Sequence, residues 1–461
     1  MNNVYKRENV WLNVDNLEEK EIFSYGERYK KFLDEAKTER QACEVIITAA
    51  EKKGFVNFED AVKKGLKKGD KVYLNFRNKA AVLMVMGEDL EQGMNIVGSH
   101  IDVPRLDLKQ VPLYENGNLA LLKTHYYGGV KKYQWVCSPL ALHGVFINNK
   151  GEKVNVVIGE NDNDPVLFIN DLLPHLGKDQ MKLTMDEGIK GEQLNAVLGH
   201  SGFGSDKDSK NPVKDKILGL LNEKYGMTEE DFISAEFELV PAGKSRDVGL
   251  DRSMIAGHGH DDRVCSYANL EAILSVENPE ITAVSLFVDK EEIGSVGNAS
   301  MESLFFENMI AEIFAQSGIN PFFKTRKSLE RSKVLSADVT CGFDPSFPEV
   351  GDTLNTALIG NGVTISKYTG ARGKGGCNDA NAEFVGEIRN LFNENNVIWQ
   401  TGELGKVDQG GGGTIAYILA KYGAEVVDCG TPMLSMHAPI ELVSKADAYM
   451  TFKAYKSFLN R

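Results

Sequence analysis

The sequence predicts an α/β protein: a three-layer α/β/α sandwich with a mixed central sheet, plus an inserted β-rich domain. From residue 246 onward, apolar stretches of helical and strand periodicity alternate, which is typical of a sheet covered by helices on both faces. Between residues 105 and 245, short apolar runs separated by turn residues replace that alternation. We therefore expect a discontinuous domain of residues 1–104 and 246–461, interrupted by a second domain of residues 105–245.

The N-terminal part supplies helices and then the first strands. Residues 16–53 carry charged and apolar residues at helical spacing and are followed by Gly54, so they predict two or more helices. Two strands follow in "KVYLNFRN" and "AAVLMVMG". The stretch "MNIVGSH" is typical of a buried central strand, and it ends at His100.

The second half of the chain alternates between strands and helices. Strands are predicted in "AVSLFV", "SKVLSAD", "VIWQTGE" and "AEVVDCG". Helices are predicted in "CSYANLEAILSV", "MESLFFENMIAEIFAQ", "AEFVGEIRNLFNE" and "TIAYILAKYG", with a closing helix from about residue 441.

Composition excludes several classes of function. The formal net charge of −14, from 66 acidic and 52 basic residues, opposes a nucleic-acid partner, because phosphates require a basic face. No run of about 18 apolar residues is present, so we expect no membrane partner. The six cysteines are scattered, form no C-x-x-C pair and follow no secretory leader, which favours reduced thiols and a cytoplasmic location.

Two segments carry histidine and aspartate just after or between predicted strands. His100 ends a strand, and Asp102 is placed to hold the far nitrogen of its imidazole, as carboxylates beside metal ligands do. The segment "GHGHDDRVCS" crowds two histidines and two aspartates into five positions, which requires either a cation or a solvated surface. Taken alone, each segment also fits a structural role.

Three further segments add carboxylates and a histidine. Glu291 and Glu292 end the apolar run "LFVDKEEIGSVG", and alternation on an extended chain sends adjacent side chains to opposite faces. The simplest assignment of roles makes one of these glutamates a metal ligand and the other a general base that faces the attacking water. Asp338 follows another strand and would also suit a helix cap, while His437 also suits a buried core position.

Taken together, two histidines, two aspartates and a glutamate at strand ends supply nitrogen and oxygen ligands for two divalent ions, with one glutamate left over. Zinc is the expected metal, with cobalt or manganese as alternatives. Open α/β sheets place their ligand sites at such strand ends.

The order of these motifs resembles the aspartyl aminopeptidase and vacuolar aminopeptidase I family of two-metal exopeptidases. The resemblance covers nearly the whole chain and includes "YYGG", "GGGGTIAYIL" and "DCGTPMLSMHAPIE". It implies a zinc-peptidase-like catalytic domain in residues 1–104 and 246–461, and a dimerisation or oligomerisation domain in residues 105–245. It also implies peptide substrates and a homo-oligomer, up to a shell of twelve subunits.

Carried onto this sequence, the resemblance implies roles for individual residues. His100 and Asp338 would hold one ion, Glu292 and His437 the other, and Asp261 would bridge them. Glu291 would be the general base and Asp102 would orient His100. Asp261 is preferred to Asp262 as the bridge because the first acidic residue of the motif corresponds to the family's bridging aspartate.

The loop "ISKYTGARGKGG" is the predicted source of substrate specificity. If acidic N-terminal residues are preferred, the pocket needs a cation, and this Gly-rich loop offers Lys367, Arg372 and Lys374. A solvated basic loop without a binding role is the alternative.

Two other functions compete with the aminopeptidase. His258, His260 and Asp262 resemble the H-x-H-x-D motif of metallo-β-lactamase-type hydrolases, although Arg263 stands where that motif has histidine. The chain could instead be a metal-binding assembly protein without catalysis, which the adjacent Glu291 and Glu292 disfavour.

Overall fold

The computed structural model describes residues 4–316, 318 and 320–461, and the chain divides into two compact units. The first unit consists of residues 1–102, 245–436 and 441–461, and the second of residues 103–244 and 437–440. Among the described residues, no helix is both long and apolar enough to cross a bilayer.

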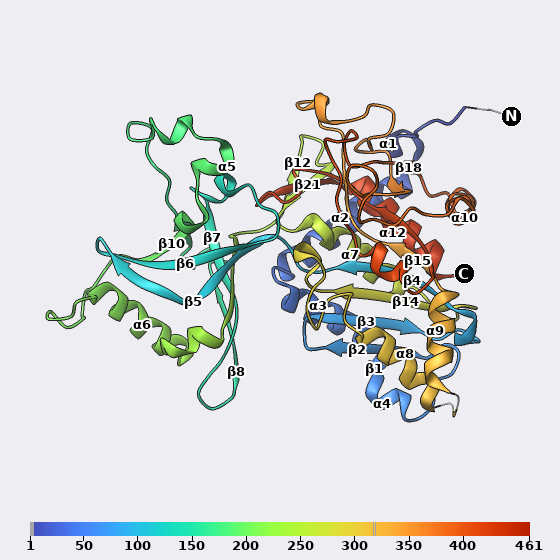
Figure 1. The fold of residues 1–461 in the computed structure, drawn as a ribbon, viewed down its shortest axis with the longest axis horizontal. Coiled ribbons are helices and arrows are strands. Elements are labelled where there is room, and N and C mark those ends of the chain that lie inside the picture. The colour runs from blue at the N-terminus through green and yellow to red at the C-terminus, as the bar shows by residue number, and fades with distance from the viewer. Residues whose placement is uncertain (1–3, 317, 319) are drawn as a thin grey trace. The chain divides into compact units, whose positions relative to one another are not determined.

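The first unit is built on a mixed sheet whose nine described strands run in the order β1-β2-β3-β14-β4-β15-β19-β17-β18 (Figure 1). Its central strands β14, β4, β15 and β19 are parallel, whereas β3 and β17 run antiparallel to their neighbours β14 and β19. The strands are β1 (Val56–Asn57), β2 (Lys71–Phe76), β3 (Ala80–Val85), β4 (Met94–His100), β14 (Thr282–Val288), β15 (Lys333–Ser336), β17 (Val363–Ser366), β18 (Trp399–Thr401) and β19 (Glu425–Gly430).

Helices supply two hydrophobic clusters, one for each face of this sheet. Successive residues of one strand belong to different clusters, such as Leu83 and Met84 in β3, because neighbouring side chains on a strand point to opposite faces. The first cluster includes α2 (Asn16–Glu35), α3 (Glu39–Lys52), α7 (His260–Leu274), α10 (Ala382–Glu394) and α12 (Lys445–Leu459). The second includes α4 (Phe58–Val62), α8 (Phe305–Gln316), α9 (Pro321–Glu330) and α11 (Ala416–Ala420).

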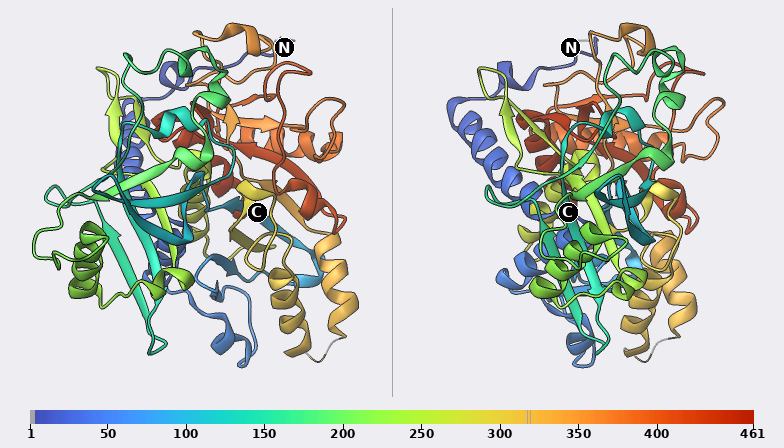
Figure 2. Two further views of the ribbon diagram at one scale, coloured as in Figure 1. Left: turned by 60° about the vertical axis from the view of Figure 1, so that its left-hand side comes forward. Right: turned by 90° about the vertical axis from the view of Figure 1, so that its left-hand side faces the viewer.

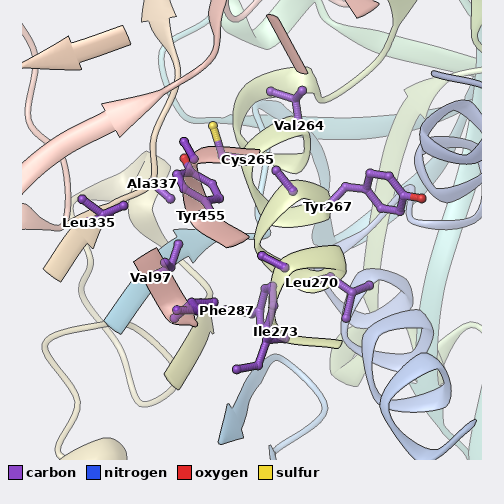
Figure 3. Packing of buried hydrophobic residues seen from close by; sticks show 14 of the residues in the cluster. Val97, Val264, Cys265, Tyr267, Leu270, Ile273, Phe287, Leu335, Ala337 and Tyr455 are labelled. Carbon is purple, nitrogen blue, oxygen red and sulfur yellow. The ribbon is translucent and has the colours of Figure 1, made fainter. Parts of the chain in front are cut away.

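Helix α7 lies in the middle of the first cluster. Figure 3 shows its residues Cys265, Leu270 and Ile273 together with Val97 of β4 and Phe287 of β14. This packing fixes the start of α7 close to the ends of the central strands, where the motif "GHGHDD" lies.

A smaller sheet of short strands completes the first unit. Its described members run in the order β12 (Arg246–Val248), β13 (Met254–Gly257), β21 (Glu441–Ser444), β20 (Pro432–Leu434) and β16 (Thr340–Cys341). The predicted start of the last helix near residue 441 is wrong, because residues 441–444 pair with β13 and β20 and α12 begins at Lys445.

The second unit contains a closed barrel of six strands among its described residues. The order is β11-β5-β6-β10-β9-β7, and β7 pairs with β11 to close the ring, while β8 extends from β7. Helix α6 (Pro212–Tyr225) packs against β5, β6 and β10 (Figures 1 and 2). The strands are β5 (Arg105–Asn116), β6 (Leu119–Tyr127), β7 (Pro139–Ile147), β8 (Lys153–Ile158), β9 (Leu167–Ile169), β10 (Asn195–Gly199) and β11 (Glu236–Pro241).

Asp447 in α12 ties a loop of the first unit to the core. Its two carboxylate oxygens accept the N–H groups of Gly360 and Gly362, each at 2.7 Å. Burial raises the pKa of Asp447 to about 7, although the two N–H donors oppose this shift. The folded state therefore holds a proton that the unfolded chain releases above about pH 4, so the stability from this group falls as the pH rises from about 4 to about 7.

We expect this pH dependence to vanish in the variant Asp447→Asn. Relative to that variant, the wild type should lose about 2–3 kcal/mol of unfolding free energy between about pH 5 and pH 8. Denaturant unfolding of both proteins at matched concentration measures the difference. A difference that stays constant with pH would contradict the buried, titrating carboxyl group.

Candidate metal centre

The centre forms where three neighbouring parallel strands end. His100 is the last residue of β4 and pairs with Val288, the last residue of β14. Strand β15 lies on the other side of β4 and ends at Ser336, two residues before Asp338. After β14, a 3₁₀ turn over Glu291–Ile293 carries the paired glutamates. The strand register thus gathers side chains that lie more than 200 residues apart in the sequence.

Two overlapping groups of side chains could each hold a metal ion. The first is His100, Asp261 and Glu292, and the second is His100, Glu291 and Asp338; within each group the ligand atoms lie within 4.8 Å of one another. The Nε2 atom of His100 lies 3.3 Å from an oxygen of Asp261 and 3.9 Å from one of Asp338.

The electrostatics of these groups suit a cation. Burial raises the pKa of Asp338 well above its usual range, although the imidazole of His100 opposes the shift. Burial lowers the pKa of His100, but the carboxylates of Asp102 and Asp261 outweigh it and raise that pKa well above its usual value. Imidazole nitrogen and carboxylate oxygen are the ligands that zinc takes, and a dication would relieve the crowding of carboxylates. The residues present therefore fit a zinc-type site.

Asp102 contacts both His100 and the turn that carries Glu291 and Glu292. It is fully buried, and its carboxylate accepts the backbone N–H groups of Glu291 at 3.1 Å and Glu292 at 3.2 Å. The same carboxylate lies 3.3 Å from Nδ1 of His100, and its backbone oxygen lies 3.0 Å from that nitrogen. A proton on Nδ1 donated to Asp102 leaves Nε2 facing Asp261 and Asp338, in the tautomer that a metal ligand needs.

The two adjacent aspartates have different surroundings. Asp261 faces Nε2 of His100, whereas Asp262 accepts the backbone N–H of His100 at 3.2 Å. The peptide bond between them is cis. Burial raises the pKa of Asp262 well above its usual range, with His100 opposing the shift. This geometry favours Asp261 over Asp262 as a metal ligand.

His260 has a structural environment. The hydroxyl of Tyr29 donates to its Nδ1 at 2.6 Å, and its Nε2 donates to the carbonyl of Ile255 at 3.1 Å. Burial lowers the pKa of His260 to about 3, so the ring is neutral. Since both nitrogens are engaged, His260 cannot ligate a metal, and the metallo-β-lactamase alternative is wrong.

Two residues that support the centre were not predicted from the sequence. Tyr29 fixes His260, and the carboxylate of Glu441 accepts the backbone N–H of Asp261 at 3.1 Å. Each lies 180 residues or more along the chain from the residue it holds, and no local pattern marks either of them.

His437 is described with the second unit. Its Nδ1 lies 2.9 Å from the carbonyl oxygen of Gly129, in the "YYGG" segment, so that hydrogen bond makes Nε2 its candidate ligand atom. Neither of the two ligand groups found among the described residues includes His437. Its role as a ligand stays a prediction.

The predicted substrate-binding cations differ in their pairing. Lys367 and Lys374 both contact Asp379, at 2.6 and 2.9 Å, and lower the pKa of that carboxyl. Lys374 also lies 3.8 Å from the ring centre of Tyr368. Within the described part of the chain, Arg372 is exposed and forms no ion pair.

Comparisons with known proteins agree over nearly the whole chain. The family model described as aminopeptidase I zinc metalloprotease (M18) matches residues 32–459. A probable M18 family aminopeptidase 1 from Clostridium acetobutylicum is 51% identical over 455 residues, which cover 98% of each chain.

Solved structures share the fold at high similarity. The M18 aminopeptidase from Thermotoga maritima superposes with a TM-score of 0.95 at 44% identity, covering 99% of this chain and 100% of that one. Aminopeptidase I from Clostridium acetobutylicum gives a TM-score of 0.93 at 49% identity, with the same coverage. The chain therefore belongs to the M18 family of aminopeptidase I zinc metalloproteases and is an aminopeptidase.

Proposed function

We propose that this aminopeptidase removes the N-terminal residue of peptides with two divalent ions per subunit. The observation that carries the proposal is the gathering of four carboxylates, from Asp261, Glu291, Glu292 and Asp338, around His100 at the ends of adjacent strands, which offers more ligand atoms than one ion needs. Because Nδ1 of His100 faces Asp102, its Nε2 serves only one of the two ions. His100 and Asp338 would hold one ion, Glu292 and His437 the other, and Asp261 would bridge them. Zinc is the expected metal, in line with the family description, with cobalt or manganese as alternatives.

When bound, the ions would supply Lewis-acid chemistry that polarises the scissile carbonyl and activates the attacking water. Glu291 accepts the proton of that water and returns it to the leaving amine. Its backbone N–H is held by Asp102, which keeps the side chain beside His100 and Asp338. Asp102 in turn orients His100, so one buried carboxylate positions both a ligand and the base.

The preference for acidic N-terminal residues belongs to the same proposal. The cations of loop 367–379 would face the substrate's first side chain, with Arg372 as the one whose charge is not offset by Asp379. We expect kcat/KM on Asp- and Glu-terminated peptides to exceed that on Leu- and Lys-terminated peptides by about tenfold or more, since about 1.4 kcal/mol of extra binding gives that factor. Steady-state rates on the four substrates measure it. Equal rates on all four would discard the cationic pocket while leaving the peptidase intact.

We also propose a homo-oligomer in the cytoplasm, with the second unit as the assembly domain. Its segment 166–185 exposes a row of large apolar side chains, which is typical of an interaction surface. They are Val166, Phe168, Leu172, Leu173, Leu176, Met181, Leu183 and Met185. The solved mApe1 dodecamer of S. cerevesiae, at 19% identity and a TM-score of 0.75, suggests twelve subunits.

The same proposal includes the architecture of the catalytic domain as a three-layer α/β/α sandwich of the zinc-peptidase kind. It is supported by the two helical clusters on the faces of the mixed sheet.

A further inference from the structure

Asp428 is a buried carboxyl group that the proposed chemistry does not use. It lies in β19, between Ser336 of β15 and Ser366 of β17 in the strand register, and is only 3% exposed. Burial raises its pKa to about 6, and the side chains of Thr414 and Ser336 oppose that shift. Its second oxygen, Oδ2, is buried and has no hydrogen-bond partner among the described residues. A buried carboxylate oxygen without a hydrogen bond calls for an explanation, and a positioning role supplies one.

Thr414 is the partner that gives Asp428 such a role. The hydroxyl of Thr414 donates to Oδ1 of Asp428 at 2.7 Å and accepts the backbone N–H of Ala416 at 3.2 Å. Ser336 lies 3.5 Å from the same hydroxyl, at the limit of a hydrogen bond. The single proton of Thr414 is therefore committed to Asp428, which fixes where the preceding segment enters α11.

The preceding segment, residues 410–413, consists of four glycines and contacts the cationic loop. The backbone N–H of Gly412 donates to the carbonyl of Thr369 at 3.1 Å. A Cβ atom on Gly411 would collide with the backbone of Ala371, and one on Gly410 with the carbonyl of Leu404. Glycine is therefore required for this close approach, and the segment fixes the base of loop 367–379.

The cationic loop has contacts both within itself and with the rest of the unit. Lys367 and Lys374 pair with Asp379 inside the loop, and the backbone N–H of Gly375 donates to Ala371, also inside it. Outside the loop, the hydroxyl of Tyr368 donates to Glu403 at 2.7 Å, and the side-chain amide of Asn378 donates to the carbonyl of Val426 in β19, also at 2.7 Å. The contact between Thr369 and Gly412 is thus one of the links between the loop and the rest of the unit, and it lies three residues before Arg372.

We propose that Thr414 and Asp428 form a positioning pair for substrate binding: their hydrogen bond anchors the glycine segment 410–413, which sets the place of the cationic loop 367–379. Neither residue touches the substrate. The inference rests on the proposed role of that loop in binding the substrate's first residue.

The test compares Thr414→Val with Thr414→Ser in the full-length enzyme. Valine has nearly the same shape but cannot donate a proton, whereas serine keeps the hydroxyl. We expect Thr414→Val to raise KM on an Asp-terminated peptide about tenfold, the effect of losing one hydrogen bond to a charged group. The kcat value and the metal content should stay within about twofold, and Thr414→Ser should behave as the wild type.

A double-mutant cycle sharpens the test. Asp428→Ala removes the same hydrogen bond from the other side, so it should raise KM to a similar extent, and it carries the test if the valine variant folds poorly. The double variant should again show about a tenfold effect, because both changes delete one interaction. If the KM of the double variant rose about a hundredfold, the product of the two single effects, the pairing would be wrong. An unchanged KM in Thr414→Val would also overturn it.

Two further outcomes separate the possible failures. Loss of metal in Thr414→Val would overturn the inference, since the hydroxyl would then act through Ser336 on Asp338. Replacement of Lys367, Arg372 and Lys374 together by alanine tests the loop itself. If that variant keeps the wild-type KM, the proposed binding role of the loop fails; if its KM rises while that of Thr414→Val does not, the positioning pair alone is wrong.

Discussion

Turnover of the variant Glu291→Gln should fall by about 10²–10⁴, the usual contribution of general acid–base catalysis, while its metal content stays that of the wild type. Glutamine keeps the size of the side chain and leaves the backbone N–H that Asp102 accepts in place, but it cannot take a proton from water. Measurements of kcat on a peptide substrate and elemental analysis of the same preparation check both parts.

The matched control is the neighbouring residue. Glu292→Gln changes the same chemical group one position along and should lose metal as well as activity, because Glu292 is assigned as a ligand. Since Glu291 also lies within 4.8 Å of ligand atoms of His100 and Asp338, loss of metal in Glu291→Gln would show that it is a ligand instead. Full turnover in that variant would remove it from the chemistry altogether.

Asp261→Asn should reduce bound metal to one ion per subunit or fewer and lower activity by more than about 10⁴. A bridging carboxylate serves both ions with two charged oxygens, and an amide offers one neutral oxygen in their place. Elemental analysis after gel filtration, with kcat on the same sample, gives the result.

Asp262→Asn is the internal control for that experiment. Oδ2 of Asp262 accepts the backbone N–H of His100. The side-chain oxygen of asparagine can accept the same hydrogen bond, so this variant should keep its metal. Retained metal in Asp261→Asn together with lost metal in Asp262→Asn would reverse the assignment of the bridge.

The strands that carry the centre were predictable because their signals are local. The apolar run of β4 ends at His100, as "MNIVGSH" predicts, and the run before Glu291 corresponds to β14. Strand β21 was not predictable as such, because four residues that pair with β13 and β20 look like the first turn of the helix that follows. Ser444 caps that helix by accepting the N–H of Ala446, and this contact marks its true start.

In the candidate site, too, local features could be predicted from the sequence, whereas contacts between distant residues could not. The types and order of the candidate ligand residues can be recognised in the sequence, since five short segments place such side chains near the ends of predicted strands. The different surroundings of Asp261 and Asp262 cannot be, because they depend on which side chain reaches His100 in three dimensions. Likewise, the crowding in "GHGHDD" indicated either a cation or a solvated surface, whereas His260 is buried and is satisfied by Tyr29 from a distant helix.

The two-ion centre can be tested by a crystal structure of the zinc-loaded enzyme with anomalous scattering recorded on both sides of the zinc absorption edge. We expect two adjacent peaks about 3.5–4 Å apart, with Asp261 between them, His100 and Asp338 at one and Glu292 and His437 at the other. A single peak, or two peaks with His437 remote from both, would show that these side chains do not hold a pair of ions.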